Sequence, residues 1–232
     1  MATNLECFKE QFDTAIKETQ RYAFLVRAHE LQQEATEKLS KLLEQCIKLK
    51  EQAIAEANES HANAFLAFEF MIRALTAELR CYILLKDDEP DRAWNSIIDA
   101  QSLAASAMKS HSVAAHLDGY IERLHALEQL VFPQQVFLSS CFIVRESECS
   151  ICGSNYGDCD HIKGRPYMGK LCSRIVKKAD LKEVSVVEDP ADRRCRAVSF
   201  SDGGTEKNTM THRSVSEPKS NLAPPEMKNE QE

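Results

Sequence analysis

The amino-acid sequence predicts an α+β protein, in which an N-terminal antiparallel helical bundle or coiled coil precedes a small zinc-containing, β-rich module and a disordered tail. Glycine and proline, which interrupt helices, occur once each in residues 1–132, as Gly119 and Pro90, but six times each in the rest of the chain. Six of the nine cysteines lie between Cys141 and Cys195. We therefore expect a helical domain over 1–132, a zinc-binding module over 133–200 and a disordered tail over 201–232.

The composition excludes wholesale disorder and a protein with many membrane spans. Of the 232 residues, 43% are hydrophobic and 28% are charged, which is ordinary for a globular protein. Residues 1–132 carry 21 acidic against 14 basic side chains, so the helical half does not offer the positive surface that nucleic-acid binding needs. Only residues 133–200, with 11 basic against 9 acidic side chains, offer such a surface.

We expect a cytoplasmic protein that does not enter a membrane. The first residues are interrupted by charges and contain no secretory signal pattern. The longest uncharged run, 129–144, is 16 residues long and contains Pro133, so it is too short and too polar to span a bilayer. In a reducing compartment, clustered cysteines are more typical of metal ligands than of disulfides.

From Leu5 to Ser60 the chain has no proline or glycine, and its apolar residues recur at steps of three and four. This spacing predicts one long helix or a pair of helices with narrow apolar stripes. The first stripe is Leu5, Phe8, Phe12, Ala15, Thr19, Tyr22 and Val26, and the second is Leu39, Leu42, Cys46, Leu49 and Ala53. Such a stripe needs a partner, which is either the next helix or a second chain. Self-association through the N-terminal helices therefore stays open.

Three further helices follow. Residues 64–85 are apolar nearly all round, which predicts the most buried helix. The acidic turn Asp87–Pro90 ends it and begins a helix with a buried face of Trp94, Ile97, Ile98, Gln101, Ala105 and Met108. Ser112 is expected to cap the last helix, whose buried side is Val113, Leu117, Tyr120, Ile121, Leu124 and Leu127.

A predicted strand over 135–144 leads into a cluster of metal-ligand residue types. Cys149 and Cys152 form a C-x2-C turn, Cys159 and His161 form a C-x-H pair, and Cys172 follows. A C-x2-C turn lets two sulfurs converge on one ion, and thiolates with an imidazole select Zn²⁺ in tetrahedral geometry. The sequence therefore predicts a structural zinc site.

Zinc takes four of these five donors. The first choice is Cys149, Cys152, Cys159 and His161, a closed set that leaves no position for water. Cys172 is the competitor for Cys159 or His161, because two ligands one residue apart need a kink in the chain. Cys195, between Arg194 and Arg196, is expected to be a half-buried thiol outside the site.

Two more predicted strands, 181–188 and 196–200, flank a Pro-Ala-Asp turn. The order of a strand, CSICG, C-x-H and EVSVV-x-x-PAD, over about 135–198, resembles the C-terminal part of tailed-phage prohead proteases. The resemblance implies a serine nucleophile at Ser185, with a histidine base upstream of the zinc insertion. Here the upstream chain is helical, so His161 is the nearby substitute. The resemblance also implies a bacterial, phage-related or anti-phage context.

These observations give three functional hypotheses. The first is a non-enzymatic interaction or adaptor protein that binds another protein and carries a structural zinc site. The second is a serine peptidase that uses Ser185 and His161, although a serine without an oriented base is a weak nucleophile. The third is a nucleic-acid adaptor that uses the basic side chains of the zinc module. Those side chains are Lys163, Arg165, Lys170, Arg174, Lys177 and Lys178.

Overall fold

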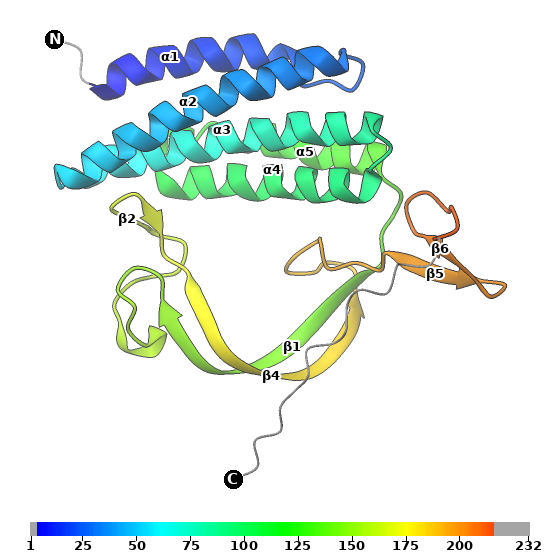
Figure 1. Ribbon diagram of the computed structural model, residues 1–232. Coiled ribbons are helices and arrows are strands. Elements are labelled where there is room, and N and C mark those ends of the chain that lie inside the picture. The colour runs from blue at the N-terminus through cyan, green and yellow to red at the C-terminus, as the bar shows by residue number, and fades with distance from the viewer. Residues whose placement is uncertain (1–3, 216–232) are drawn as a thin grey trace.

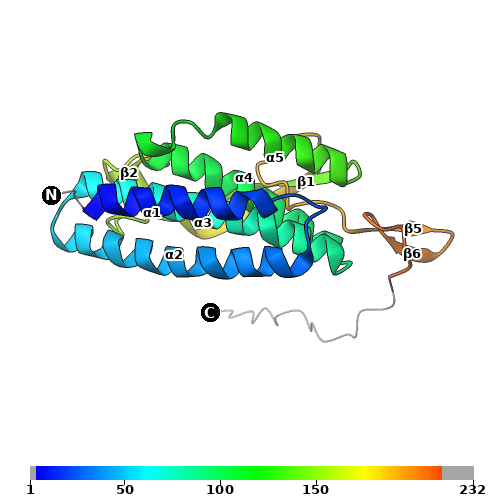
Figure 2. The ribbon, with the colours of Figure 1, turned by 90° about the horizontal axis from the view of Figure 1, so that it is seen from above.

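The computed structural model describes residues 4–215. The first part of this range forms the helices α1 (Asn4–Thr19), α2 (His29–Ala55), α3 (Glu59–Lys86), α4 (Pro90–Ser110) and α5 (Asp118–Val131). They lie side by side as a bundle above a long β-ribbon (Figure 1). Seen from above, α1 lies over α3 between α2 and α5 (Figure 2). The predicted α+β class is confirmed. Within residues 4–215, no helix is both long and apolar enough to cross a membrane.

The centre of the bundle is α3, as its apolar sequence predicts. Ile72 and Leu79 on this helix are fully buried. The aromatic rings of α1 pack on those of α3, with ring centroids 5.6 Å apart for Phe8 and Phe65. Burial of these side chains provides the main stabilisation of the bundle.

The second apolar stripe packs inside the chain. Leu39, Leu42 and Cys46 of α2 are buried in one cluster with α3, and the Cys46 thiol donates to the Phe65 carbonyl at 3.3 Å. The predicted helical segment over 5–60 is a pair of helices, because the 3₁₀ turn η1 (Gln20–Tyr22) interrupts it. The first apolar stripe ends at this turn. The prediction that Val26 is its last member is wrong, because the Val26 side chain is 91% exposed.

A buried carboxylate connects α3 to α5. Glu78 is fully buried and accepts hydrogen bonds from the Tyr82 and Tyr120 hydroxyls at 3.0 and 2.9 Å. Arg123 donates to both of its oxygens, at 2.7 and 2.8 Å. Burial, followed by the nearby Glu78 carboxylate, raises the pKa of both tyrosines, so they remain neutral donors. The buried charge is thus fully hydrogen-bonded, as burial requires.

The predicted start of the last helix is wrong. Ser112 begins a single 3₁₀ turn, η2 (Ser112–Ala114), and α5 starts only at Asp118. The cap of that turn is the preceding residue, His111, whose Nδ1 accepts from the Val113 amide at 3.1 Å. The hydrogen-bond acceptor that caps this turn is therefore an imidazole nitrogen of His111, and not the Ser112 hydroxyl that the sequence predicts.

The rest of the described chain is built from β-hairpins. The strands β1 (Phe137–Cys149) and β4 (Arg174–Val187) pair antiparallel, from Phe137 opposite Val187 to Cys149 opposite Arg174. They form a curved two-stranded ribbon that arches beneath the helices (Figure 1). The ribbon is longer than the predicted strands 135–144 and 181–188. Its far end carries the 3₁₀ turn η3 (Tyr156–Asp158) and a short hairpin of β2 (Pro166–Tyr167) and β3 (Lys170–Leu171).

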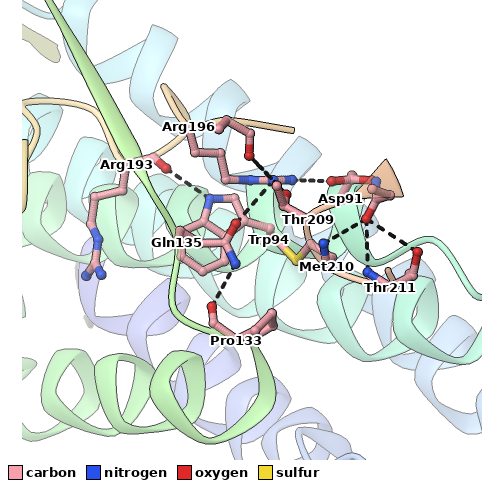
Figure 3. A network of polar contacts seen from close by, with 11 residues as sticks. Asp91, Trp94, Pro133, Gln135, Arg193, Arg196, Thr209, Met210 and Thr211 are labelled. Atoms are coloured by element: carbon pink, nitrogen blue, oxygen red, sulfur yellow. Dashed lines mark hydrogen bonds and ion pairs between the residues drawn. The ribbon is translucent and has the colours of Figure 1, made fainter. Parts of the chain in front are cut away.

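A polar network fixes the base of the ribbon to α4 (Figure 3). The Arg196 side chain is only 3% exposed and forms an ion pair with Asp91, while also donating to the Gln135 side chain at 3.2 Å. The Trp94 indole donates to the Arg193 carbonyl at 3.0 Å. The predicted strand 196–200 is present in part here, because Arg196 bridges to Phe137. Arg196 therefore holds three chain segments together.

The tail is ordered further than its composition predicts. The strands β5 (Ser199–Asp202) and β6 (Thr205–Asn208) form a hairpin, and Asn208 donates to the Asp91 carboxylate at 2.8 Å. Gly203 and Gly204 at the turn have φ of 57° and 87°, which glycine adopts without strain. The expectation of disorder from residue 201 is therefore wrong up to residue 215, and its remainder, 216–232, lies outside the described residues.

Candidate metal centre

The C-x2-C turn begins where β1 ends, at Cys149. The Gly153 amide donates to the Cys149 carbonyl at 2.9 Å, and Gly153 has a φ of 72°, so the chain reverses sharply after Cys152. The Ile151 amide also points at the Cys149 sulfur, at 3.4 Å. The turn thus directs two sulfurs and a backbone donor to one point, which is the geometry that the spacing predicts.

Cys159 and His161 approach the same point from the next loop. The residue before them, Asp158, ends η3, and Cys159 is extended, with φ −121° and ψ 152°. In extended chain, residues two apart face the same side, so the C-x-H spacing needs no kink. The His161 ring lies edge-on to the Tyr167 ring, with centroids 4.7 Å apart. Its Nδ1 is buried without a hydrogen-bond partner among the described residues.

The structure brings the four predicted ligands of the first choice together. One ligand atom from each of Cys149, Cys152, Cys159 and His161 lies within 4.8 Å of each of the others. These four residues could therefore hold a metal ion. The buried, unpartnered Nδ1 of His161 supports that role, because a buried polar atom normally has a partner.

Cys172 lies against the same cluster. Its sulfur is 3.8 Å from the Cys149 sulfur, and the residue is 2% exposed. Two thiolates on one tetrahedral zinc, each about 2.3 Å from it, would lie about 3.8 Å apart. The loop that carries Cys172 is fixed, because its amide donates to the Arg165 carbonyl at 2.8 Å. Cys172 thus lies beside the four converging donors, in contact with Cys149, and the choice of four ligands stays open between Cys172 and a member of the C-x-H pair.

The C-x2-C turn lowers the pKa of the Cys149 thiol. Burial acts to raise the pKa of Cys149, but the amides of Cys152 and Ile151 and the neighbouring thiols donate to its sulfur and lower that pKa to about 7. The Ser154 amide and hydroxyl lower the pKa of Cys152. Burial, and then the neighbouring Cys149, raises the pKa of Cys172 to about 11. The site therefore presents thiolates first at the C-x2-C turn, and a bound cation is needed to deprotonate the rest.

Ser185 and His161 are not brought together. Ser185 lies in β4 opposite Ser139, while His161 lies beyond the other end of the ribbon, where Cys149 pairs with Arg174. The 11 residue steps from Arg174 to Ser185 cover about 36 Å along the strand, at roughly 3.3 Å per step. A general base has to lie about 3 Å from the nucleophile.

Other predicted residues lie elsewhere on the module. Arg174 donates to the Ser147 hydroxyl at 2.8 Å, and Lys177 pairs with Glu148 at 2.9 Å, so these two members of the basic set are engaged within the ribbon. Lys163, Arg165, Lys170 and Lys178 are exposed. The expected partial burial of Cys195 is wrong, because this thiol is exposed, and it lies outside the group of converging ligands.

A contact between the metal module and the bundle was not predicted from the sequence. The Gly169 amide, in the β2–β3 turn, donates to the Asn63 side chain of α3 at 2.8 Å. The Met168 amide donates to Glu59 at 3.3 Å. The sequence signal was weak: Asn63 stands just before the apolar run 64–85, where a buried amide needs a partner.

The described chain thus defines an α+β protein that carries a candidate Cys/His metal centre at the end of a β-ribbon. No protein-family model, curated protein or solved structure matches it. The resemblance to prohead proteases, and the phage-related context that it implies, remain predictions from the sequence motifs.

Proposed function

We propose that the chain is a non-enzymatic adaptor protein of the cytoplasm, and that its metal centre is a structural zinc site. In this proposal the zinc fixes the loops at the far end of the ribbon, and the bundle and ribbon present surfaces to another protein. The observation that carries the proposal is the convergence of four Cys and His ligand atoms within 4.8 Å of one another.

The donor set favours zinc over other metals. Thiolates and an imidazole are soft or borderline ligands, whereas Mg²⁺ and Ca²⁺ take oxygen ligands. The Cys149 to Cys172 sulfur distance of 3.8 Å matches the edge of a tetrahedral thiolate site. This supports zinc as the resident ion.

The donor count favours a structural role. A catalytic zinc keeps one position open for water or substrate, usually with three protein ligands. Four donors already converge within 4.8 Å of one another, which is the number that tetrahedral zinc takes, and the Cys172 thiol lies beside them. A metal held here would have no free position, and its contribution would be to the stability of residues 149–172.

The zinc proposal predicts the metal content of the purified protein. We expect about one zinc per chain by mass spectrometry of the metal, lost in Cys149→Ser and in Cys152→Ser. Cys141→Ser is the matched control, because Cys141 is an exposed thiol of β1 outside the cluster. Metal-free wild-type protein with an unchanged amide-exchange pattern over 149–172 would refute the proposal, as would equal zinc loss in the Cys141→Ser control.

The adaptor proposal also predicts that Ser185 does not react as a nucleophile. Ser185 lies opposite another serine, and His161 is far along the ribbon. We therefore expect a fluorophosphonate probe to leave the protein unlabelled, as detected by intact mass. Stoichiometric labelling that Ser185→Ala abolishes and Ser139→Ala preserves would instead establish the peptidase alternative.

A further inference from the structure

The ribbon of β1 and β4 has one apolar face. Residues that pair across an antiparallel ladder share a face, and alternate residues of a strand face opposite sides. Phe137 and Val187 pair at the base and pack on the core around Trp94. The face on the other side is made of the next four alternate pairs, Leu138 with Val186, Ser140 with Val184, Phe142 with Leu181, and Val144 with Ala179. We call these eight residues the ribbon face.

The ribbon face is uncharged, and no other segment within residues 4–215 covers it. Its large side chains stand in solvent, with exposed fractions of 53% for Phe142, 57% for Leu181, 54% for Val184 and 72% for Val186. The opposite face at the same level carries charge, since Glu183 pairs with Cys141 and Asp180 pairs with Ile143. In an ordinary amphipathic strand pair the apolar face packs on the core. Here the charged face is on the side that packs on the helical core, and the apolar face is on the other side.

The edges of the ribbon do not offer a similar surface. The register shifts leave three extra residues in the ladder, Lys182, Arg145 and Lys177. Bulges and charged side chains at strand edges prevent pairing with further strands. The face is therefore the surface of the ribbon that favours contact with another chain.

The ribbon face is held in place before any partner arrives. At the base, the Leu138 amide donates to the Cys195 carbonyl at 2.9 Å, and Arg196 anchors the neighbouring chain to α4. At the far end, the Gly169 amide donates to Asn63 of α3. A two-stranded hairpin is marginally stable in water alone, and a second layer stabilises it. An interface that is fixed in advance loses little entropy on binding.

We propose that the ribbon face is a self-association surface, where two copies of this chain stack their ribbons face to face. The eight side chains contain no charge and one hydroxyl, so the partner has to be equally apolar along four pairs. An identical ribbon has this property and the same length and twist, and a two-fold contact covers both faces at once. The two ribbons would lie about 10 Å apart, as stacked sheets do.

The exposed area makes this a reversible dimer. The four large side chains expose somewhat more than the surface of two complete side chains. Even at the roughly 250 Å² that a large aromatic side chain buries, this is at most about 600 Å² per copy, or about 1,200 Å² for the pair. Stable interfaces bury about 1,200–2,000 Å² in total. The expected dissociation constant is therefore in the range of about 1 µM to 1 mM.

The test is sedimentation velocity of the zinc-loaded full chain over that concentration range. We expect the mass to rise from 26.2 kDa toward twice that value. Leu181→Lys and Phe142→Lys should each weaken the dimer at least tenfold, because each places two like charges in the interface. Ile143→Lys is the matched control, since Ile143 is 39% exposed on the opposite face of the same strand. It should dimerise like the wild type.

Melting temperature and zinc content show whether each variant is folded, and these two readouts should not change because the substituted side chains are exposed. The proposal is overturned if the wild type stays monomeric up to about 1 mM. Equal loss of dimer in Ile143→Lys also overturns it. The proposal is also overturned if the wild-type monomer binds phosphatidylcholine vesicles and Leu181→Lys abolishes that binding. The ribbon face would then bind a lipid surface and not a second copy of the chain.

Discussion

Leu42 of α2 is 6% exposed and lies in the same core cluster as Phe65 and Phe68 of α3. A lysine at this position would bury a charge without a partner, so Leu42→Lys should destabilise the folded monomer by at least about 3 kcal/mol. Thermal and urea unfolding measure this. Leu31→Lys is the control on the same helix, because Leu31 is 36% exposed and the change should cost under about 1 kcal/mol. A change of oligomeric mass without loss of stability would instead indicate a coiled coil between chains.

A second residue-scale prediction concerns Glu78, which is fully buried while its partner Arg123 is 43% exposed. Arg123→Met removes two hydrogen bonds and leaves the carboxylate to the two tyrosines. We expect a loss of about 2 kcal/mol in urea unfolding, less than for a fully buried pair because water reaches the arginine side. Adding Glu78→Gln removes the unpaired charge, so the double variant should be more stable than Arg123→Met alone. A double variant that is less stable would contradict this account.

At the scale of single elements, the helices were predictable because their signals are local. Apolar spacing, the Asp87–Pro90 turn and the scarcity of glycine all act within a few residues, and α3 and α4 lie where these signals put them. The prediction failed where a distant contact decides the structure. Asn208 is held by Asp91 of α4, so the C-terminal hairpin is ordered although its composition resembles that of a disordered segment.

The candidate metal site was predictable to a similar extent. The C-x2-C turn and the C-x-H pair are local patterns, and the structure brings these four residues together. The position of Cys172 depends on the β2–β3 hairpin folding back, which the sequence spacing does not specify. The ribbon face could not be predicted from the sequence. Which apolar residues of β1 and β4 pair on one face depends on the bulges that set the register, and these are known only from the structure.

The thiols of the metal site predict a pH dependence of metal binding. Metal ligands have to be deprotonated, and without metal the pKa of Cys149 is about 7 while that of Cys172 is raised to about 11. Lowering the pH from 8 to 6 protonates Cys149 and raises the free-energy cost of removing the protons from all the thiol ligands, so zinc affinity should fall. We expect more than a tenfold loss per pH unit below pH 7, measured by competition with a chelator. An affinity that is constant from pH 6 to 8 would exclude thiolate ligands.

At the scale of the whole molecule, the ribbon is an arch with two supports (Figure 1). One support is the Arg196 network on α4, and the other is the β2–β3 turn on α3. Metal at the far end would stabilise the loops that present this second support. We therefore expect a chelator to increase amide exchange over 149–172 while helical circular dichroism changes little, because the core of the bundle lies elsewhere. If helical circular dichroism is lost as the chelator removes the metal, the bundle and the metal module unfold as one unit.

The second support depends on Gly169, which has a φ of 75° and would bring an added Cβ to 3.2 Å from the Ile54 side chain of α2. Gly169→Ala should therefore strain the turn and push it from the bundle, at a cost of about 1–2 kcal/mol, while the zinc content is retained. The measurement is amide exchange over 166–171, which should increase in Gly169→Ala and also in Asn63→Ala, because each variant disturbs the same contact. Gly164→Ala is the matched control, since Gly164 has a similar φ of 82° but no atom within 4 Å of an added Cβ. It imposes comparable strain without touching α2 or α3, so exchange at Gly169 should stay at the wild-type rate. Equal exchange at Gly169 in all three variants would mean that strain in the loops, and not contact with the bundle, controls how the module is held.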